Sequence, residues 1–131
     1  MKLEFVEFKS GDAMRKGNAV PKSINANILI SNAEAEKDRL KIDFEYGVSY
    51  QPDQSYVRMK GSATFIGPEA AKSVEEWKKT KKITGEHGEF IFNALYYHCS
   101  INALLITRVF GIAPPIALPT LKIGVSPKGV S

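Results

Sequence analysis

The stretch EFIFNALYYHCSINALLITRVFGI, residues 89–112, decides the fold of this chain. Between residues 90 and 106 its few polar side chains are Asn93, His98, Ser100 and Asn102. At about 100° of rotation per residue, the apolar side chains spread over most of the circumference of a helix. A helix that is apolar nearly all round is buried nearly all round. One sheet covers only one side of such a helix, so we expect a second cover on the other side.

Length and composition indicate one globular domain. A chain of 131 residues with 44% hydrophobic and 24% charged residues has an ordinary globular composition. The net charge of +4 permits contact with nucleic acid or an anionic membrane without arguing for either. The single cysteine, Cys99, is compatible with a reducing compartment, so we expect a cytoplasmic protein. Polar residues and Arg108 interrupt the long apolar stretch, so we expect no membrane insertion.

The chain ahead of the long helix predicts strands. Residues 2–9 predict a first strand, with Leu3 and Phe5 on one face and Val6 and Phe8 on the other. Glycine and proline residues between positions 10 and 22 indicate a loop. Residues 24–36 alternate apolar and polar side chains, which is the period of a strand with one wet face.

The clearest strand is predicted at residues 39–51, where Ile42, Phe44 and Tyr46 alternate with charged side chains. A Pro52-Asp53 turn separates it from a similar strand at 55–66. Short turns between such strands imply antiparallel pairing, and residues 68–82 predict a short charged helix. The predicted fold class is therefore α+β: a four-stranded antiparallel β-meander with a long apolar helix and a short helix packed on one face.

The order of these elements, together with one short motif, resembles a known family. The meander over residues 24–66, the long helix and the segment Gly-x-x-Pro-Pro-Ile-x-Leu-Pro at 111–119 are similar to the SecB-like chaperones. Aromatic residues near the start of the helix and Arg108 near its end stand at comparable positions. The resemblance covers most of residues 2–123. We therefore predict one SecB-like domain over residues 1–123 and a frayed tail at 124–131.

The resemblance implies an ATP-independent holdase chaperone with a link to protein transport. SecB-like proteins hold unfolded or nascent polypeptides in apolar grooves, need no cofactor, and assemble as dimers or as tetramers. On this resemblance, the client-binding groove consists of Phe65, Ile66, Phe110, Ile112, Pro115, Ile116, Leu118 and Leu121. The second cover over the long helix is then another copy of the chain. The residues that we assign to this oligomer interface are Phe90, Ala94, Tyr97, His98, Ile101 and Leu105.

The sequence departs from the family pattern in two ways. We expect no counterpart of the family's closing helix in residues 124–131, because this segment has neither the length nor the periodicity for one. The chain is basic, whereas the bacterial export chaperone is strongly acidic. Coupling to the translocase motor therefore does not follow from the resemblance.

Other functions have weaker support in the sequence. His87, His98 and Cys99 do not have metal-ligand spacing, and no nucleophile and base can be paired, so we expect no enzyme and no metal. The alternative is a nucleic-acid-binding or adaptor module that uses the basic helix between Lys72 and Lys82. Glutamates alternate with these lysines at spacings that are typical of a solvated helix face. An affinity for nucleic acid that falls steeply with salt concentration would distinguish this alternative from a chaperone that holds clients by apolar surface.

Overall fold

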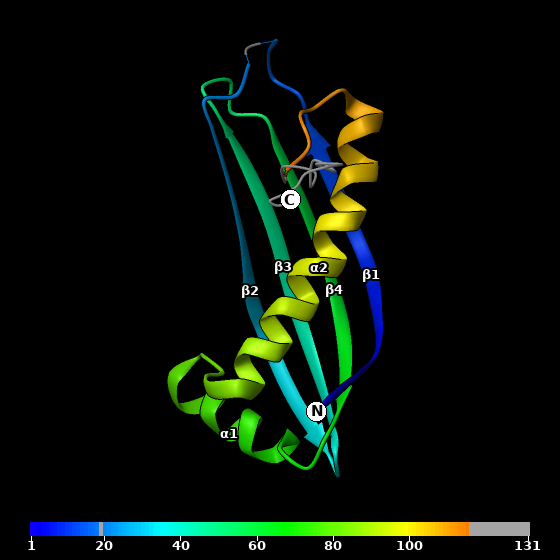
Figure 1. Cartoon of the computed structure of the whole chain (residues 1–131), viewed down its shortest axis with the longest axis vertical. Helices are drawn as coiled ribbons and strands as arrows, with labels where there is room; N and C mark the ends of the chain where they lie inside the picture. The colour runs from blue at the N-terminus through cyan, green and yellow to red at the C-terminus, as the bar shows by residue number, and fades with distance from the viewer. Residues whose placement is uncertain (19, 116–131) are drawn as a thin grey trace, which may run out of the picture.

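The computed structural model describes residues 1–18 and 20–115, which form one sheet with two helices on one of its faces (Figure 1). The elements in chain order are β1 Lys2–Met14, β2 Ser23–Glu36, β3 Arg39–Gln51, β4 Tyr56–Ile66, α1 Ala70–Thr80 and α2 Gly85–Phe110. The predicted α+β class is confirmed. The predicted end of the domain at residue 123 and the tail at 124–131 lie outside the described residues.

The four strands pair antiparallel in the order β1-β4-β3-β2. Strands β2, β3 and β4 form a meander, whereas β1 adds to the far side of β4 instead of pairing with β2. The connection after β1 therefore crosses the end of the sheet before β2 begins, at the top of Figure 1. As a result, β1 and β2 are the two edge strands of the sheet within the described residues.

Strand β1 is longer than the sequence predicted. The loop was predicted to begin at residue 10, and this was wrong. Gly11 and Asp12 still pair with Met59 and Arg58 of β4, and the strand continues to Met14. The Arg58 guanidinium and the Asp12 carboxylate form an ion pair of 2.9 Å across these strands. Gly11 was part of the predicted loop, but it lies within the strand. Its missing side chain allows close packing against Met59, since a Cβ at Gly11 would lie 3.3 Å from the Cγ of Met59.

A β-bulge near the start of β1 overturns the predicted faces of its side chains. The register with β4 shifts between Leu3 and Phe5. Leu3, Val6 and Phe8 consequently pack against the core, while Phe5 is 51% exposed. An extra residue in one strand reverses the faces of the side chains that follow it, and strict alternation cannot anticipate this.

The core lies between the sheet and the helices. The helix-facing side chains of β3 are almost inaccessible to solvent, as a period of two requires: Leu40, Ile42, Phe44, Tyr46, Val48 and Tyr50. Gly61 of β4 lies at the centre of this face, where a Cβ would overlap the carbonyl oxygen of Glu7 on β1. Only glycine allows the two backbones and the Phe44 ring to approach so closely.

Helix α2 packs on the sheet through a stripe of mostly small side chains. The buried residues are Gly88, Ile91, Leu95, Cys99, Ser100, Ala103 and Thr107. Small residues let a helix lie close to the layer beneath it. The helix begins at Gly85, four residues earlier than predicted, because the turn at residues 85–88 is already helical. It ends where Gly111 adopts a left-handed conformation with φ of 67°, and Ile112 N–H donates to the Thr107 carbonyl at 2.8 Å.

The two helices cover the sheet unevenly. Helix α1 buries Ala70, Val74 and Trp77 and lies beside the lower end of β2 (Figure 1). Helix α2 crosses the sheet on a diagonal, from β2 beside α1 to β1 at the opposite end (Figure 1). Two opposite corners of the helix-facing surface therefore lie outside the path of α2: the upper part of β2 and the lower part of β1 (Figure 1).

Candidate functional site

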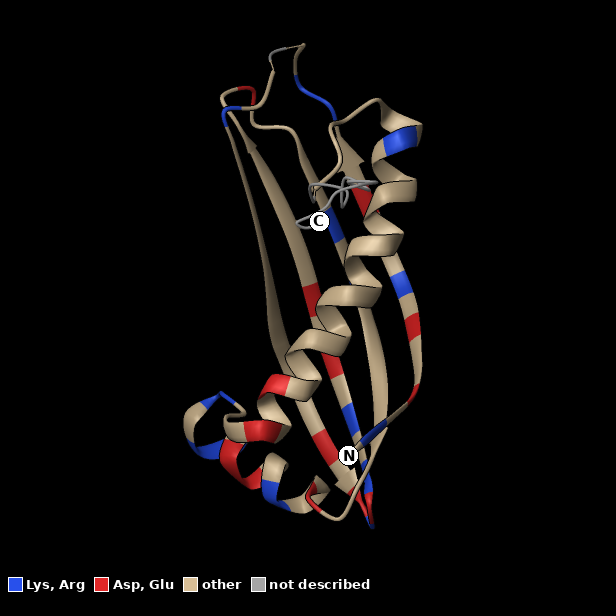
Figure 2. Ribbon diagram, in the orientation of Figure 1, with Lys and Arg blue, Asp and Glu red and all other residues tan. Residues whose placement is uncertain are grey.

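A stripe of large apolar side chains on α2 faces away from the sheet. Tyr97 and Leu105 are 63% and 62% exposed, and Ile101 between them is 42% exposed. Their spacing of four residues places them on one side of the helix. Figure 2 shows that this part of α2 carries no charged residue before Arg108. We call Phe90, Ala94, Tyr97, Ile101 and Leu105 the outer stripe.

The structure places the six residues of the predicted oligomer interface as follows. The five members of the outer stripe are exposed or half-buried, and His98 beside them is half-buried. The His98 ring lies 5.5 Å from the Tyr97 ring, and its backbone carbonyl accepts a hydrogen bond from Asn102. Phe90 also touches the core, because its ring lies 6.1 Å from that of Phe65. The six residues therefore share one surface, and their role as an interface stays a prediction.

The described members of the predicted groove lie in two separate groups, and their role as a groove stays a prediction. Phe65 is buried under Phe90 at the start of α2, and Ile66 pairs with the first residues of β1 and β3. Phe110, Ile112 and Pro115 lie at the other end of α2, about 30 Å away along the helix. The remaining predicted members, Ile116, Leu118 and Leu121, lie outside the described residues.

Of this second group, Ile112 lines a cavity of about 450 Å³ beyond the end of α2. We call it the α2-end cavity. It is lined by Arg15, Gly17, Asn18, Val20, Pro21, Tyr50, Asp53, Ser55, Gly111, Ile112 and Ala113. Val20 is 84% exposed at its margin, and Phe110 nearby is 47% exposed. The cavity thus combines apolar walls with a guanidinium and a carboxylate.

Hydrogen bonds fix the walls of the α2-end cavity. The Tyr50 hydroxyl donates to the Ala113 carbonyl at 2.7 Å, which ties the chain after α2 to the sheet. Burial raises the pKa of Tyr50 to about 12, so this hydroxyl stays protonated at neutral pH. Arg15 donates to the Gly17 carbonyl at 3.1 Å and to the Asn18 side chain at 2.6 Å. Sequence reasoning missed Arg15, Val20 and Tyr50, because their distance from residue 112 in the sequence gives no sign of their proximity.

A second, more apolar cavity of about 360 Å³ lies under the first turns of α2. We call it the β2-edge cavity. It is lined by Ile28, Leu29, Ile30, Lys81, Lys82, Ile83, Thr84, Gly88, Phe92 and Leu95. Phe92 stacks on Tyr96 with ring centroids 6.3 Å apart, and it is still 50% exposed. Phe92 is one of the aromatic residues near the start of the helix that carry the resemblance, but the sequence did not predict it as a site residue.

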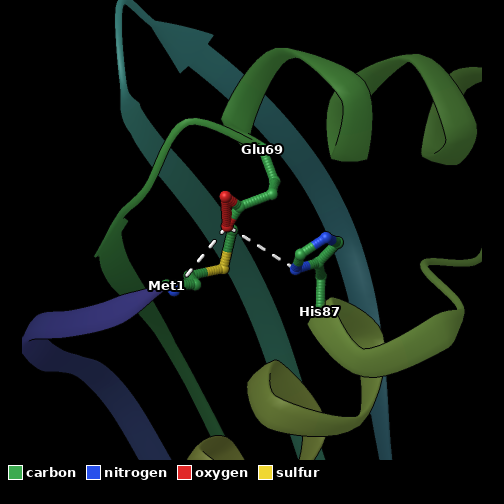
Figure 3. Close-up of polar contacts among 3 residues, drawn as sticks. All are labelled: Met1, Glu69 and His87. Atoms are coloured by element: carbon green, nitrogen blue, oxygen red, sulfur yellow. Dashed lines mark ion pairs between the residues drawn. The ribbon is translucent and has the colours of Figure 1, made fainter.

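Polar contacts between the helices are structural. The Glu69 carboxylate lies 3.6 Å from both the Met1 amino group and the His87 imidazole, and so connects the start of β1 to both helices (Figure 3). Hydrogen bonds from the Thr84 hydroxyl and backbone N–H lower the pKa of Glu76. These contacts hold α1 against the start of α2.

Within the described residues, the geometry gives no support for a cysteine nucleophile, a metal site or a nucleic-acid-binding helix. Burial raises the pKa of Cys99 to about 12, so its thiol is not a nucleophile at neutral pH. Within residues 1–18 and 20–115, no three His, Cys, Asp or Glu side chains could together hold a metal ion. On the basic helix, Lys81 lies over the Trp77 ring at 4.0 Å and caps the C-terminus of α1. That lysine therefore has a local structural role.

Helix α2 is also long and apolar enough to cross a membrane, judged by length and composition alone. The core helix of a globular protein passes the same test. In this chain, Ser100 and Thr107 of α2 are buried in the contact with the sheet. The helix therefore already has a protein surface against one of its sides.

Comparison with known proteins identifies the fold. No protein-family model matches the sequence, and no curated protein matches it. Among solved structures, the SecB-like chaperone Rv1957 of Mycobacterium tuberculosis, in complex with a ChAD peptide from the HigA1 antitoxin, is similar with a TM-score of 0.57. The match has 13% sequence identity and covers 95% of this chain and 92% of the other. On this evidence the chain has a SecB-like fold.

Proposed function

We propose that this protein is an ATP-independent holdase chaperone that binds unfolded or nascent polypeptides. The observation that carries the proposal is the α2-end cavity, which combines exposed Val20, buried Ile112 and the charged side chains of Arg15 and Asp53. The solved neighbour is a chaperone with a bound peptide, and this supports a peptide as the ligand. The proposal places the protein in the cytoplasm and includes a role in protein transport.

The α2-end cavity suits an extended peptide for physical reasons. A volume of about 450 Å³ accommodates one or two large side chains, and most of the binding free energy then comes from apolar burial. Arg15 and Asp53 can hydrogen-bond backbone carbonyl and N–H groups of the client, which every sequence offers. Binding of this kind selects unfolded chains without selecting one sequence, and it needs no nucleotide.

Oligomerisation is the second part of the proposal. The outer stripe presents a row of large apolar side chains, and an exposed row of this kind marks an interaction surface. We assign it to a second copy of the chain, whose own outer stripe has the same chemistry. Two sheets would then enclose two α2 helices, and each copy would cover the outward side of its partner's α2, as the apolar sequence of this helix predicts.

The test is suppression of aggregation of thermally unfolding citrate synthase, followed by light scattering. The wild-type protein should suppress aggregation equally with and without ATP. Val20→Asp should reduce this activity at least about fivefold, because it places a charge at the apolar margin of the cavity. The melting temperature should change little, since Val20 is exposed.

The matched control is Phe5→Asp, which removes an exposed apolar side chain from the opposite face of the sheet. It should leave the holding activity unchanged. Equal losses from both variants would mean that any exposed apolar residue contributes, and the site assignment would fail. A wild-type protein without holding activity would refute the proposed function itself.

A further inference from the structure

The β2-edge cavity has walls that are mostly apolar. Ile28 and Ile30 line it from β2, and Ile83 lines it from the segment between the two helices. Helical rotation places Phe92 on the same side of α2 as Cys99, which is fully buried. Phe92 is nevertheless 50% exposed, because β2 is an edge strand within the described residues and α2 begins at that edge (Figure 1). A ligand that covers these side chains removes apolar surface from water.

The charged residues in this lining are two lysines. Within the part of the chain that the structure describes, Lys81 and Lys82 line the cavity and no Asp or Glu does. Both lysines are exposed, and they follow the last turn of α1 beside the start of α2 (Figure 2). The nearby Glu76 carboxylate accepts hydrogen bonds from the Thr84 N–H, at 2.9 Å, and from the Thr84 hydroxyl. That carboxylate is therefore held at Thr84, and the charge on the cavity lining is positive.

We propose that the β2-edge cavity binds a medium-chain fatty carboxylate, such as decanoate. The hydrocarbon chain lies between β2 and Phe92, and the carboxylate lies at Lys82. Apolar walls bind any hydrocarbon and ammonium groups bind any anion, so the two together select a molecule that has both parts. The volume of about 360 Å³ is near the lower limit for small-molecule sites, which suits a single short chain. This cavity shares no lining residue with the α2-end cavity, so the inference goes beyond the proposed function.

The chain contains its own probe for this site. Trp77 is the single tryptophan and is 8% exposed. The Lys81 ammonium lies over the Trp77 ring, 4.0 Å from its centroid. A carboxylate in the cavity attracts this ammonium away from the ring and so changes the fluorescence of Trp77. Binding is therefore measurable without a label.

Titration of the full chain with fatty carboxylates, at concentrations below micelle formation, tests the inference. Decanoate should change the Trp77 fluorescence and bind about tenfold more tightly than octanoate, because two more methylenes are buried. Decanol, which has the same chain length and no charge, should bind at least about fivefold more weakly than decanoate. Isothermal titration calorimetry should give the same affinities without relying on the tryptophan. Decanol that binds as tightly as decanoate would overturn the inference.

Substitutions at exposed positions separate the two parts of the site. Lys82→Gln should weaken decanoate binding at least about fivefold and leave decanol binding unchanged. Phe92→Ser should weaken the binding of both ligands about tenfold, since it removes apolar wall. The matched control is Lys79→Gln, because Lys79 is exposed in the last turn of α1 and does not line the cavity. Equal losses from Lys82→Gln and Lys79→Gln would mean that overall charge attracts decanoate, and would overturn the site.

Three further outcomes would place the ligand elsewhere or assign the cavity to another occupant. Val20→Asp, at the margin of the α2-end cavity, should leave decanoate binding unchanged, and a loss of binding in this variant would overturn the inference. A response to phosphatidylglycerol vesicles without a response to decanoate would assign the lysines to a membrane surface and overturn it. Displacement of decanoate by an acidic unfolded peptide would assign the cavity to clients and also overturn it. Holding of citrate synthase is measured separately, so its absence in the wild type would refute only the proposed function.

Discussion

The two sides of α2 differ in the size and exposure of their side chains. The sheet-facing side contains Cys99, Ala103 and other small buried residues, and it permits a close approach between helix and sheet. The outward side presents Tyr97, Leu105 and other large residues that remain exposed. Since both sides are apolar, hydrophobicity alone does not separate them. From Tyr97 to Thr107, side-chain size does separate them, because the sheet-facing side packs closely against the sheet and the outward side has no partner within residues 1–18 and 20–115.

The largest expected effect comes from the sheet-facing side. Leu95→Ala should lower the free energy of unfolding by about 3 kcal/mol, because Leu95 is 1% exposed and the truncation leaves a cavity between α2 and the sheet. Chemical denaturation measures this loss. A change below about 1 kcal/mol would mean that α2 is not part of the cooperative core, and the contrast between its two sides would disappear.

A charge on the outward side should separate the chains without unfolding them. Tyr97→Asp, at 63% exposure, should reduce the mass of the assembly by half at micromolar concentration, because the charge would be buried without a partner in the interface. Circular dichroism should show unchanged secondary structure. The control is Phe5→Asp, which is 51% exposed and lies on the face of the sheet away from α2. A wild-type monomer by light scattering would refute the interface.

The buried side should also make stability depend on alkaline pH. Burial raises the pKa of Cys99 to about 12 from its ordinary value of 9.0, so the folded state keeps a proton that the unfolded state releases. The stabilising contribution is complete below pH 9 and is lost as the pH rises from 9 through 12. Cys99→Ala should reduce the decline in unfolding free energy over this range. An identical decline in the variant would show that other groups cause it.

The smallest effect is expected from salt. If clients bind through apolar surface, raising the salt concentration from about 50 to 200 mM should change their affinity less than about twofold. Binding of nucleic acid through the basic residues of α1 would instead weaken by orders of magnitude over the same range. Fluorescence anisotropy with a labelled unfolded peptide and with a labelled oligonucleotide measures both. A steep loss for the peptide would favour an electrostatic surface.

The sequence predicted the strands best where side chains alternate strictly. The limits of β3 agree with the prediction at residues 39–51, because every second residue from Leu40 to Tyr50 enters the core. In β1 the prediction was wrong, since a bulge after Leu3 and a closely packed Gly11 depend on β4, which is more than forty residues away in the sequence. Register across strands is a tertiary property and leaves no local pattern.

The candidate site was predictable only where a local pattern determines the position of its side chains. The position of Tyr97, Ile101 and Leu105 on one side of α2 follows from helical rotation alone. The separation of Phe65 from Phe110 does not, because it depends on the direction in which α2 crosses the sheet. Phe92 was missed because the width of the sheet beneath a helix cannot be read from the sequence of the helix.

The diagonal path of α2 also bears on how this protein can change over evolutionary time. The corner with the α2-end cavity and the corner with the β2-edge cavity lie at opposite ends of one stiff helix and share no lining residue. Substitutions that are far apart and have no common neighbours combine additively. Substitutions in one corner can therefore change the shape and charge of its cavity without disturbing the other corner. Over many generations the two cavities can change independently, although a single helix connects them.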